Sequence, residues 1–131
     1  MAFKFRIITP YGEFFNGEVD IVNVKTKDGV VGILKNHIPL VSPVEISCLT
    51  FRVNGEERKC VVSDGILYVE ENQTRIIVNS CEYIEDIDLE RALESKKRAE
   101  ERLSSKNENI DIKRAELSLR RAINRINASK N

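Results

Sequence analysis

The chain changes its composition within residues 79–99, which read NSCEYIEDIDLERALESKKRA. All six glycines, all three prolines, all three tyrosines and all five phenylalanines lie at or before Tyr83 in this stretch. Beyond Tyr83 the chain is built mainly from Ala, Leu, Glu, Lys and Arg, which are good helix formers. The sequence therefore predicts two parts, a head over residues 1–84 and a helical part over residues 85–131.

The head has the pattern of an antiparallel β-sandwich. Phe3, Phe5 and Ile7 alternate with polar residues, as in a strand with one buried face. Turn signals interrupt the apolar runs at residues 9–12, 16–17, 28–29, 54–55, 64–65 and 71–72. The Asn-Gly and Asp-Gly pairs among them supply the positive φ angles of tight hairpins. This spacing predicts an α+β fold in which about ten short strands form the sandwich and a two-helix antiparallel hairpin follows.

The spacing of apolar residues in the helical part predicts helices over residues 88–103 and 111–126, joined by a polar segment at 104–109. The apolar residues lie near one side of the first helix (Leu89, Ala92, Leu93, Ala99 and Leu103) and at steps of three and four in the second (Ile112, Ala115, Leu119, Ala122 and Ile126). Such an alanine-rich seam buries little area, so the pair is only marginally stable alone. The sequence leaves open whether the hairpin moves or forms a fixed lid.

The two predicted helices share a motif. Ile87-Asp88-x-x-Arg91-Ala92 recurs 23 residues later, with Ile110 at its start, and Arg98 and Arg102 recur in the same way. The aspartates suit helix N-caps. The arginines at i, i+7 and i+11 lie within about 20° of one helix azimuth. Guanidinium groups bind phosphate oxygens through paired hydrogen bonds, so these arginines could form a phosphate-binding surface. The alternative is an ordinary solvated face.

Several functions are disfavoured by composition. The 21 basic residues equal the 21 acidic ones in number, whereas nucleic-acid binders usually have a basic excess. The single histidine, His37, belongs to no nucleophile–base or metal-ligand grouping, and the three cysteines lack C-x-x-C spacing. We therefore expect no catalytic residues, no metal site and no enzymatic activity of the chain by itself. No apolar run is long enough to span a bilayer.

Three stretches resemble the epsilon-subunit family of bacterial F-type ATP synthases. Residues 29–41, GVVGILKNHIPLV, are similar to that family's G-x-L-G-I-L-P-G-H-A-P-L segment, and residues 62–69, VSDGILYV, to its V-S-G-G-x-L-E-V strand pair. Residues 85–92, EDIDLERA, contain its I/L-D-x-x-R-A motif. Lys35-Asn36 replaces the usual Pro-Gly, and Val30 replaces a common acidic residue.

The resemblance implies a non-catalytic central-stalk subunit of the H⁺-transporting ATP synthase, which couples proton-driven rotation to ATP synthesis. Its partners would be the gamma subunit, the c-subunit ring and the alpha and beta subunits, at the cytoplasmic face of the bacterial cell membrane as a peripheral protein. An exposed loop with His37 and Ile38 would contact the ring.

The resemblance further implies a mobile helix pair that inhibits ATP hydrolysis and binds ATP as a regulatory ligand, with no required cofactor. The candidate ATP-site residues are Glu82, Ile87, Asp88, Arg91, Ala92, Arg98, Arg121 and Arg125. Two other functions remain open at this point: a free-standing nucleotide-sensing module, and a passive helical adaptor.

Overall fold

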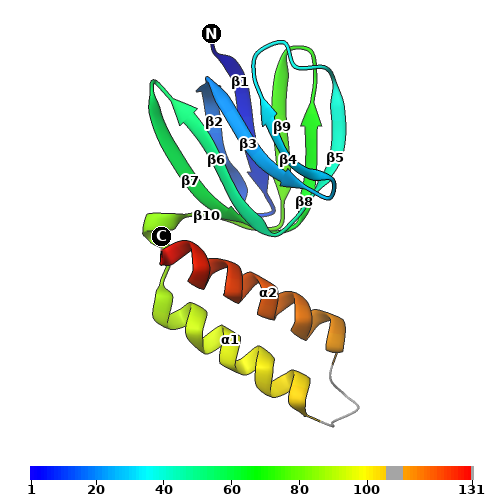
Figure 1. The fold of residues 1–131 in the computed structure, drawn as a ribbon, viewed down its shortest axis with the longest axis vertical. Coiled ribbons are helices and arrows are strands. Elements are labelled where there is room, and N and C mark those ends of the chain that lie inside the picture. The colour runs from blue at the N-terminus through cyan, green and yellow to red at the C-terminus, as the bar shows by residue number, and fades with distance from the viewer. Residues whose placement is uncertain (106–110, 131) are drawn as a thin grey trace. The chain divides into compact units, whose positions relative to one another are not determined.

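A computed structural model describes residues 1–105 and 111–130. The chain divides into two compact units, Met1–Tyr83 and a second unit that begins at Ile84. The first unit is the head, and the second holds the two helices (Figure 1). This boundary lies one residue before the one expected from composition.

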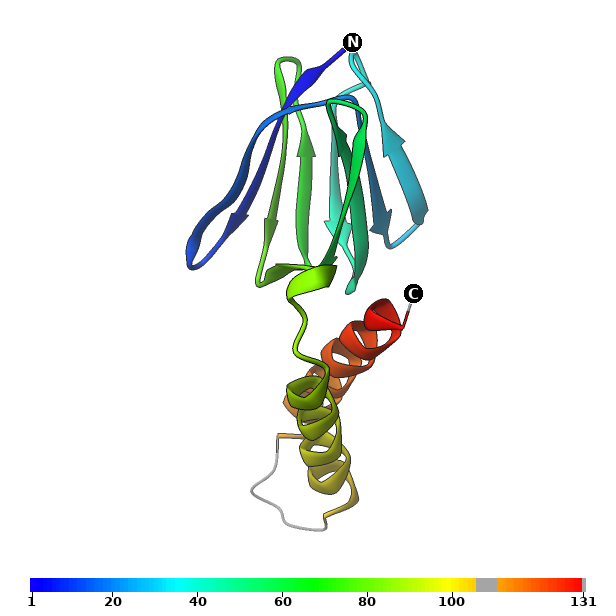
Figure 2. The ribbon, with the colours of Figure 1, turned by 90° about the vertical axis from the view of Figure 1, so that its left-hand side faces the viewer.

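The head contains ten strands that form one continuous sheet. Its order is β10-β7-β6-β3-β5-β8-β9-β1-β2, with β4 beside β3. The sheet bends so that its strands form the two walls of a sandwich (Figure 2). The strands are β1 (Phe3–Thr9), β2 (Gly12–Val19), β3 (Ile21–Thr26), β4 (Gly29–Ile33), β5 (Leu40–Val44), β6 (Ser47–Val53), β7 (Glu56–Val62), β8 (Gly65–Val69), β9 (Gln73–Val78) and β10 (Cys81–Tyr83).

The core of the head lies between these walls. Phe5 and Ile7 of β1 are fully buried, and their neighbours Lys4 and Arg6 are not, which confirms the predicted alternation. The ring of Phe51 on β6 lies 5.6 Å from that of Phe5 and 4.7 Å from that of Phe15 on β2, centroid to centroid. Tilted aromatic pairs at this spacing are favourable, so they join strands that lie far apart in the sheet order.

The strand pairing is antiparallel, as predicted, except between β1 and β9. These two strands run parallel, with Phe5 opposite Thr74. A parallel pair needs a long crossover connection, and here strands β2 to β8 supply it. The local turn signals carry no information about this long-range pairing, so the sequence did not predict it.

The predicted turns differ in outcome. Asn54 and Gly55 have φ angles of 50° and 82° and join β6 to β7, as expected for a tight Asn-Gly hairpin. The predicted turn at Asn16-Gly17 is wrong, because both residues lie inside β2 and pair with β1. Space is tight there, since a Cβ atom on Gly17 would lie 3.1 Å from Cζ of Phe15.

The second unit begins with a short 3-10 helix, η1 (Ile84–Asp86), followed by α1 (Leu89–Ser104) and α2 (Ile112–Ser129). Both predicted N-caps are confirmed. The Asp88 carboxylate accepts a hydrogen bond from the backbone N–H of Arg91, and that of Asp111 from Arg114, each at 3.1 Å. The expected helix bounds were close, although α2 continues three residues past the predicted end. Ile110 and most of the predicted polar segment, residues 106–109, lie outside the described residues.

The two helices run antiparallel and side by side (Figures 1 and 2). Their contact is narrower than expected, because Leu89 and Leu93 are 40% and 47% exposed. At 100° per residue these leucines point away from the contact line. The residues buried along the seam are Ala92, Ala99, Ala115, Ala122 and Ile126.

Candidate functional site

Six arginines lie along one edge of the helical hairpin. In each helix they are offset by about 80–120° from the buried alanines, in the same rotational sense. When two helices pack antiparallel, side chains with the same offset from the seam lie on the same side of the pair. The two stripes therefore combine into one surface, the arginine edge, made of Arg91, Arg98 and Arg102 from α1 and Arg114, Arg121 and Arg125 from α2.

Much of this edge has no acidic partner. Ion pairs of the head join Arg6 to Glu13, Lys25 to Glu45 and Arg75 to Glu70. None of them involves the exposed side chains of Arg91, Arg98, Arg102 and Arg114. Arg98 donates a hydrogen bond to the hydroxyl of Ser95 at 3.3 Å. Such a concentration of uncompensated guanidinium groups favours an anionic ligand.

The other candidate ATP-site residues have varied positions. The Asp88 carboxylate caps α1, and Ile87 is half-buried just before that helix. Ala92 is only 3% exposed, so its methyl group belongs to the seam and lets the helices approach closely. Glu82 lies in β10 of the head, in a different unit from the arginines. The hairpin thus gathers Arg91, Arg98, Arg121 and Arg125 on one edge.

The loop that carries His37 begins with a β-turn. The backbone N–H of His37 donates to the carbonyl of Leu34 at 3.2 Å, and Asn36 has a φ of 67°. A Pro-Gly pair suits such a turn because glycine accepts positive φ, and asparagine tolerates it better than most other residues. The substitution of Lys35-Asn36 is therefore compatible with a tight turn.

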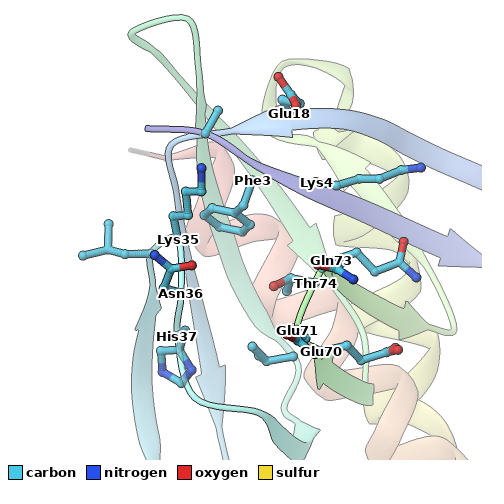
Figure 3. A pocket seen from close by; sticks show the side chains of 14 residues that line it. Phe3, Lys4, Glu18, Lys35, Asn36, His37, Glu70, Glu71, Gln73 and Thr74 are labelled. Atoms are coloured by element: carbon cyan, nitrogen blue, oxygen red, sulfur yellow. The ribbon is translucent and has the colours of Figure 1, made fainter.

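The side chain of His37 is half-buried, whereas the sequence predicted it to be exposed; Ile38 is 79% exposed. The Nδ1 atom of His37 lies 2.6 Å from the carbonyl oxygen of Ile38. Because a carbonyl oxygen only accepts, Nδ1 carries the proton. The ring borders a pocket of about 260 Å³, opposite Glu71 and Thr74 (Figure 3). The sequence did not predict this pocket, since its lining comes from separate segments at residues 2–4, 18, 34–37 and 69–74.

A second feature that the sequence missed is an apolar patch on the outer side of β5, β8 and β9. Its members pair across the strands, Val41 with Tyr68, Pro43 with Ile66, and Ile66 with Ile77. Val41, Ile66 and Ile77 are 68%, 41% and 37% exposed. Exposed apolar patches of this kind commonly mark protein interfaces. We call these five residues the outer apolar face.

Two further kinds of site are not found in the described part of the chain. No group of three or more His, Cys, Asp or Glu side chains is arranged to hold a metal ion. Neither described helix is long and apolar enough to cross a membrane.

Comparison with known proteins assigns both units. Residues 2–84 match the profile of the ATP synthase delta/epsilon chain β-sandwich domain, and residues 85–130 match that of its long α-helix domain. The chain belongs to the ATP synthase delta/epsilon family. Its membership makes it a non-catalytic subunit of an F-type ATP synthase, so the chemistry on ATP takes place in other subunits. This confirms the family and the fold inferred from the sequence, and it removes the reading of a free-standing module.

Relatives within the delta/epsilon family match over nearly their whole length. The ATP synthase epsilon chain of Bacillus velezensis is 41% identical over 98% of this chain and 97% of its own. That of Halalkalibacterium halodurans is 45% identical over 95% and 94%. Among solved structures, a chain of the Euglena gracilis mitochondrial ATP synthase matches with a TM-score of 0.82, at 19% identity over 99% of this chain and 82% of its own. A chain of the Tetrahymena thermophila enzyme matches with a TM-score of 0.61, at 15% identity over 98% and 97%.

Proposed function

We propose that this subunit regulates ATP hydrolysis through its helical hairpin, which binds ATP on the arginine edge. The observation that carries the proposal is the edge itself. Arginines from two helices, exposed at Arg91 and Arg98 and half-buried at Arg121 and Arg125, share one side of a hairpin whose seam consists mostly of alanine. A ligand that contacts arginines of both helices would hold them together more strongly than their own packing does.

Arg91 and Arg98 from α1 would bind the phosphate oxygens, and Arg121 and Arg125 would close the site from α2. Guanidinium groups hold phosphates through paired, charge-assisted hydrogen bonds. A ligand shifts an equilibrium by its difference in affinity between the two states. At a free ATP concentration 100-fold above Kd, this linkage stabilises the bound state by about 2.7 kcal/mol.

The sign of the regulation follows. Abundant ATP would keep the hairpin folded and allow hydrolysis in the assembled enzyme. Scarce ATP would release the helices, which would then extend to the alpha and beta subunits and inhibit hydrolysis. In this proposal ATP is a regulatory ligand, and the chain requires no cofactor.

Titration of the full chain with ATP tests the proposal, by calorimetry and by NMR of the backbone amides. Losing a hydrogen bond to a charged group costs about 1.5–3 kcal/mol, so Arg91→Gln or Arg125→Gln should weaken ATP binding about tenfold or more. The matched control is Arg120→Gln, which removes the same charge from the opposite side of α2. An unchanged spectrum at millimolar ATP, or an equal loss of affinity in the control, would contradict the proposal.

We also propose that the head attaches the subunit to the rotor. The outer apolar face offers exposed aliphatic side chains beside the half-buried Tyr68, which suit the core of an interface with the gamma subunit. The His37 loop, with the exposed Ile38 at its tip, would contact the c-subunit ring. The subunit would then lie at the cytoplasmic face of the bacterial cell membrane, held there through the complex.

Two substitutions separate these contacts. Ile66→Glu should release the subunit from gamma, as measured by co-purification with the stalk. Ile38→Glu should lower proton-driven ATP synthesis and leave hydrolysis by the detached soluble sector unchanged. Equal loss of both activities with Ile38→Glu would place that loop away from the ring.

A further inference from the structure

The pocket beside His37 lies at the end of the sandwich where β1 and β9 begin and where β4 and β8 end. Its lining includes Phe3, Val69 and Thr74, and all of it belongs to the head. The volume of about 260 Å³ is below the roughly 300–1,000 Å³ of pockets that enclose drug-sized ligands. It therefore suits a small polar group and is too small for a nucleotide.

Thr74 supplies a buried hydroxyl group to this pocket. It lies opposite the buried residues Phe5 and Val69, so its side chain faces the space between the two walls, and it is only 2% exposed. Within the described residues this hydroxyl forms no hydrogen bond. Other buried polar side chains of the head do form one, namely Thr26, Ser42, Ser47 and Ser63.

An unbonded hydroxyl in this position destabilises the head, because burial of a polar group without a hydrogen bond is unfavourable. The Thr74 oxygen is not wholly shielded from solvent, and the residue lines the pocket. In Figure 3 the Thr74 side chain points toward the loop that carries Asn36 and His37. The hydroxyl is thus directed into the pocket, where a ligand can bond to it.

Hydrogen-bond acceptors surround this hydroxyl. Since Nδ1 of His37 carries the proton, Nε2 of the neutral ring is an acceptor. The Asn36 amide and the Thr74 hydroxyl each supply an acceptor oxygen, and the half-buried ring of Phe3 adds a flat apolar wall. Acceptors beside an aromatic ring suit a planar cation with several N–H donors. A guanidinium group has five such donors and stacks on aromatic faces.

The charged side chains that line the pocket do not favour an anion. They comprise three carboxylates and two ammonium groups, from Glu18, Glu70, Glu71, Lys4 and Lys35. The Glu70 carboxylate already accepts from Arg75 at 2.8 Å. Glu71 lies opposite His37 (Figure 3) and, in the described part of the chain, forms no ion pair. Its carboxylate is therefore available to a bound cation.

We propose that this pocket binds a guanidinium group, which donates to the Thr74 hydroxyl, to Nε2 of His37 and to the Glu71 carboxylate while it packs on the ring of Phe3. Two sources present this chemistry: a free guanidinium compound, and an arginine side chain of a neighbouring subunit. A lysine ammonium group lacks the planar fork of donors and should bind more weakly. The site goes beyond the proposed function, since it requires neither ATP nor the arginine edge.

The test is an NMR titration of the full, isotope-labelled chain with arginine amide and with lysine amide at constant ionic strength. Thr74→Val removes the hydroxyl and keeps the shape of the side chain. The matched control is Thr50→Val, the same substitution on β6, away from the pocket. Phe3→Leu is a second variant, which removes the flat ring and keeps an apolar side chain.

Arginine amide should shift the amide resonances of the pocket residues in a saturable way and bind at least tenfold more tightly than lysine amide. Loss of a hydrogen bond to a charged ligand weakens binding about tenfold or more, so Thr74→Val should show that loss and Thr50→Val should not. Phe3→Leu should weaken binding severalfold. Equal affinity for the two amides, equal loss in the control, or shifts that do not saturate would overturn the site.

Urea unfolding without ligand supplies an independent readout. Thr74→Val should raise the unfolding midpoint, because it replaces an unbonded buried hydroxyl with a methyl group. Thr26→Val should lower it, since the Thr26 hydroxyl donates to the carbonyl of Gly29 at 2.8 Å. An equal fall in both variants would show that the Thr74 hydroxyl is already bonded within the head, and it would overturn the proposal.

Hydrogen exchange of residues 69–74, measured in the isolated chain and in the complete synthase, identifies the source of the group. Protection in the synthase without added ligand would assign the site to an arginine of a neighbouring subunit. Protection that needs arginine amide in both forms would assign it to a free guanidinium compound. Absence of protection under every condition would refute the site, whatever the outcome for ATP.

Discussion

The alanine seam of the hairpin makes one substitution especially informative. Ala99 is 2% exposed between α1 and α2, and Ala99→Leu would place three additional carbon atoms where the helices meet. Burial of each alanine methyl group stabilises the packed helices by about 0.8 kcal/mol, and burial of Ile126 by about 2 kcal/mol. Burial along the whole seam therefore stabilises the helix pair by about 5 kcal/mol. Overpacking one site costs about 1–3 kcal/mol, which is a large part of that total.

Ala99→Leu should therefore separate the helices and leave the head folded. Circular dichroism should show reduced helix content and a lower melting temperature for the helical signal. Amide resonances of the head should keep their wild-type positions. If ATP binds across both helices, saturating ATP should restore much of the lost helix content. ATP at 100-fold excess over Kd stabilises the bound state by about 2.7 kcal/mol, which is comparable with the destabilisation caused by the added leucine.

The control is Glu101→Leu, which introduces the same side chain on the exposed surface of α1. It should leave helix content unchanged. If Ala99→Leu melts like the wild type, the helices are not closely packed at this position. If both variants lose helix content equally, the effect comes from the added leucine and not from the seam.

Four further predictions concern the head. Residues 1–84 should fold alone and still bind the stalk; if this fragment fails to co-purify with gamma, the head alone does not carry the stalk contact. Gly65→Ala should destabilise the head by about 3 kcal/mol or more in urea unfolding, since the new Cβ atom would collide with the backbone of β9. Asn36→Gly should stabilise the head by a few tenths of a kcal/mol and Asn36→Val should destabilise it by about 1–2 kcal/mol, because residue 36 has positive φ. Desolvation raises the pKa of the Cys48 thiol, so its alkylation should be slow at neutral pH and accelerate as pH rises, whereas the fully buried Cys60 should react only after unfolding, as mass spectrometry would show.

The features that the sequence predicted are those encoded locally. The alternation around Phe5, the Asn54-Gly55 hairpin and the capping aspartates each depend on a few neighbouring residues. The misassigned turn at Asn16-Gly17 shows the limit of such signals: Gly17 lies in a strand beside the ring of Phe15 and has no positive φ angle. Gly65 is required for space, because a Cβ atom there would collide with the backbone of β9, the next strand along the chain.

In the candidate site, too, the features encoded locally were predicted and those that depend on long-range packing were not. Helix periodicity alone put three arginines of each helix in one stripe, and the antiparallel packing of the helices then placed both stripes on one edge. The outer apolar face was not predicted, because Val41, Ile66 and Ile77 become neighbours only through strand order. The half-buried state of His37 likewise depends on strands that come from other parts of the chain.

The parallel pairing of β1 with β9 has a consequence for the synthesis of the chain. Strand β1 ends at Thr9 and β9 ends at Val78, so at about 5–20 residues per second the first strand waits several seconds for this neighbour. During that interval Phe5 and Ile7 cannot reach their final environment. The contacts between α1 and α2 are local and form on the microsecond-to-millisecond scale, and these helices leave the ribosome after the head. The chain is thus made in an order that allows the slow, long-range sheet to close before the fast-folding helical hairpin is complete.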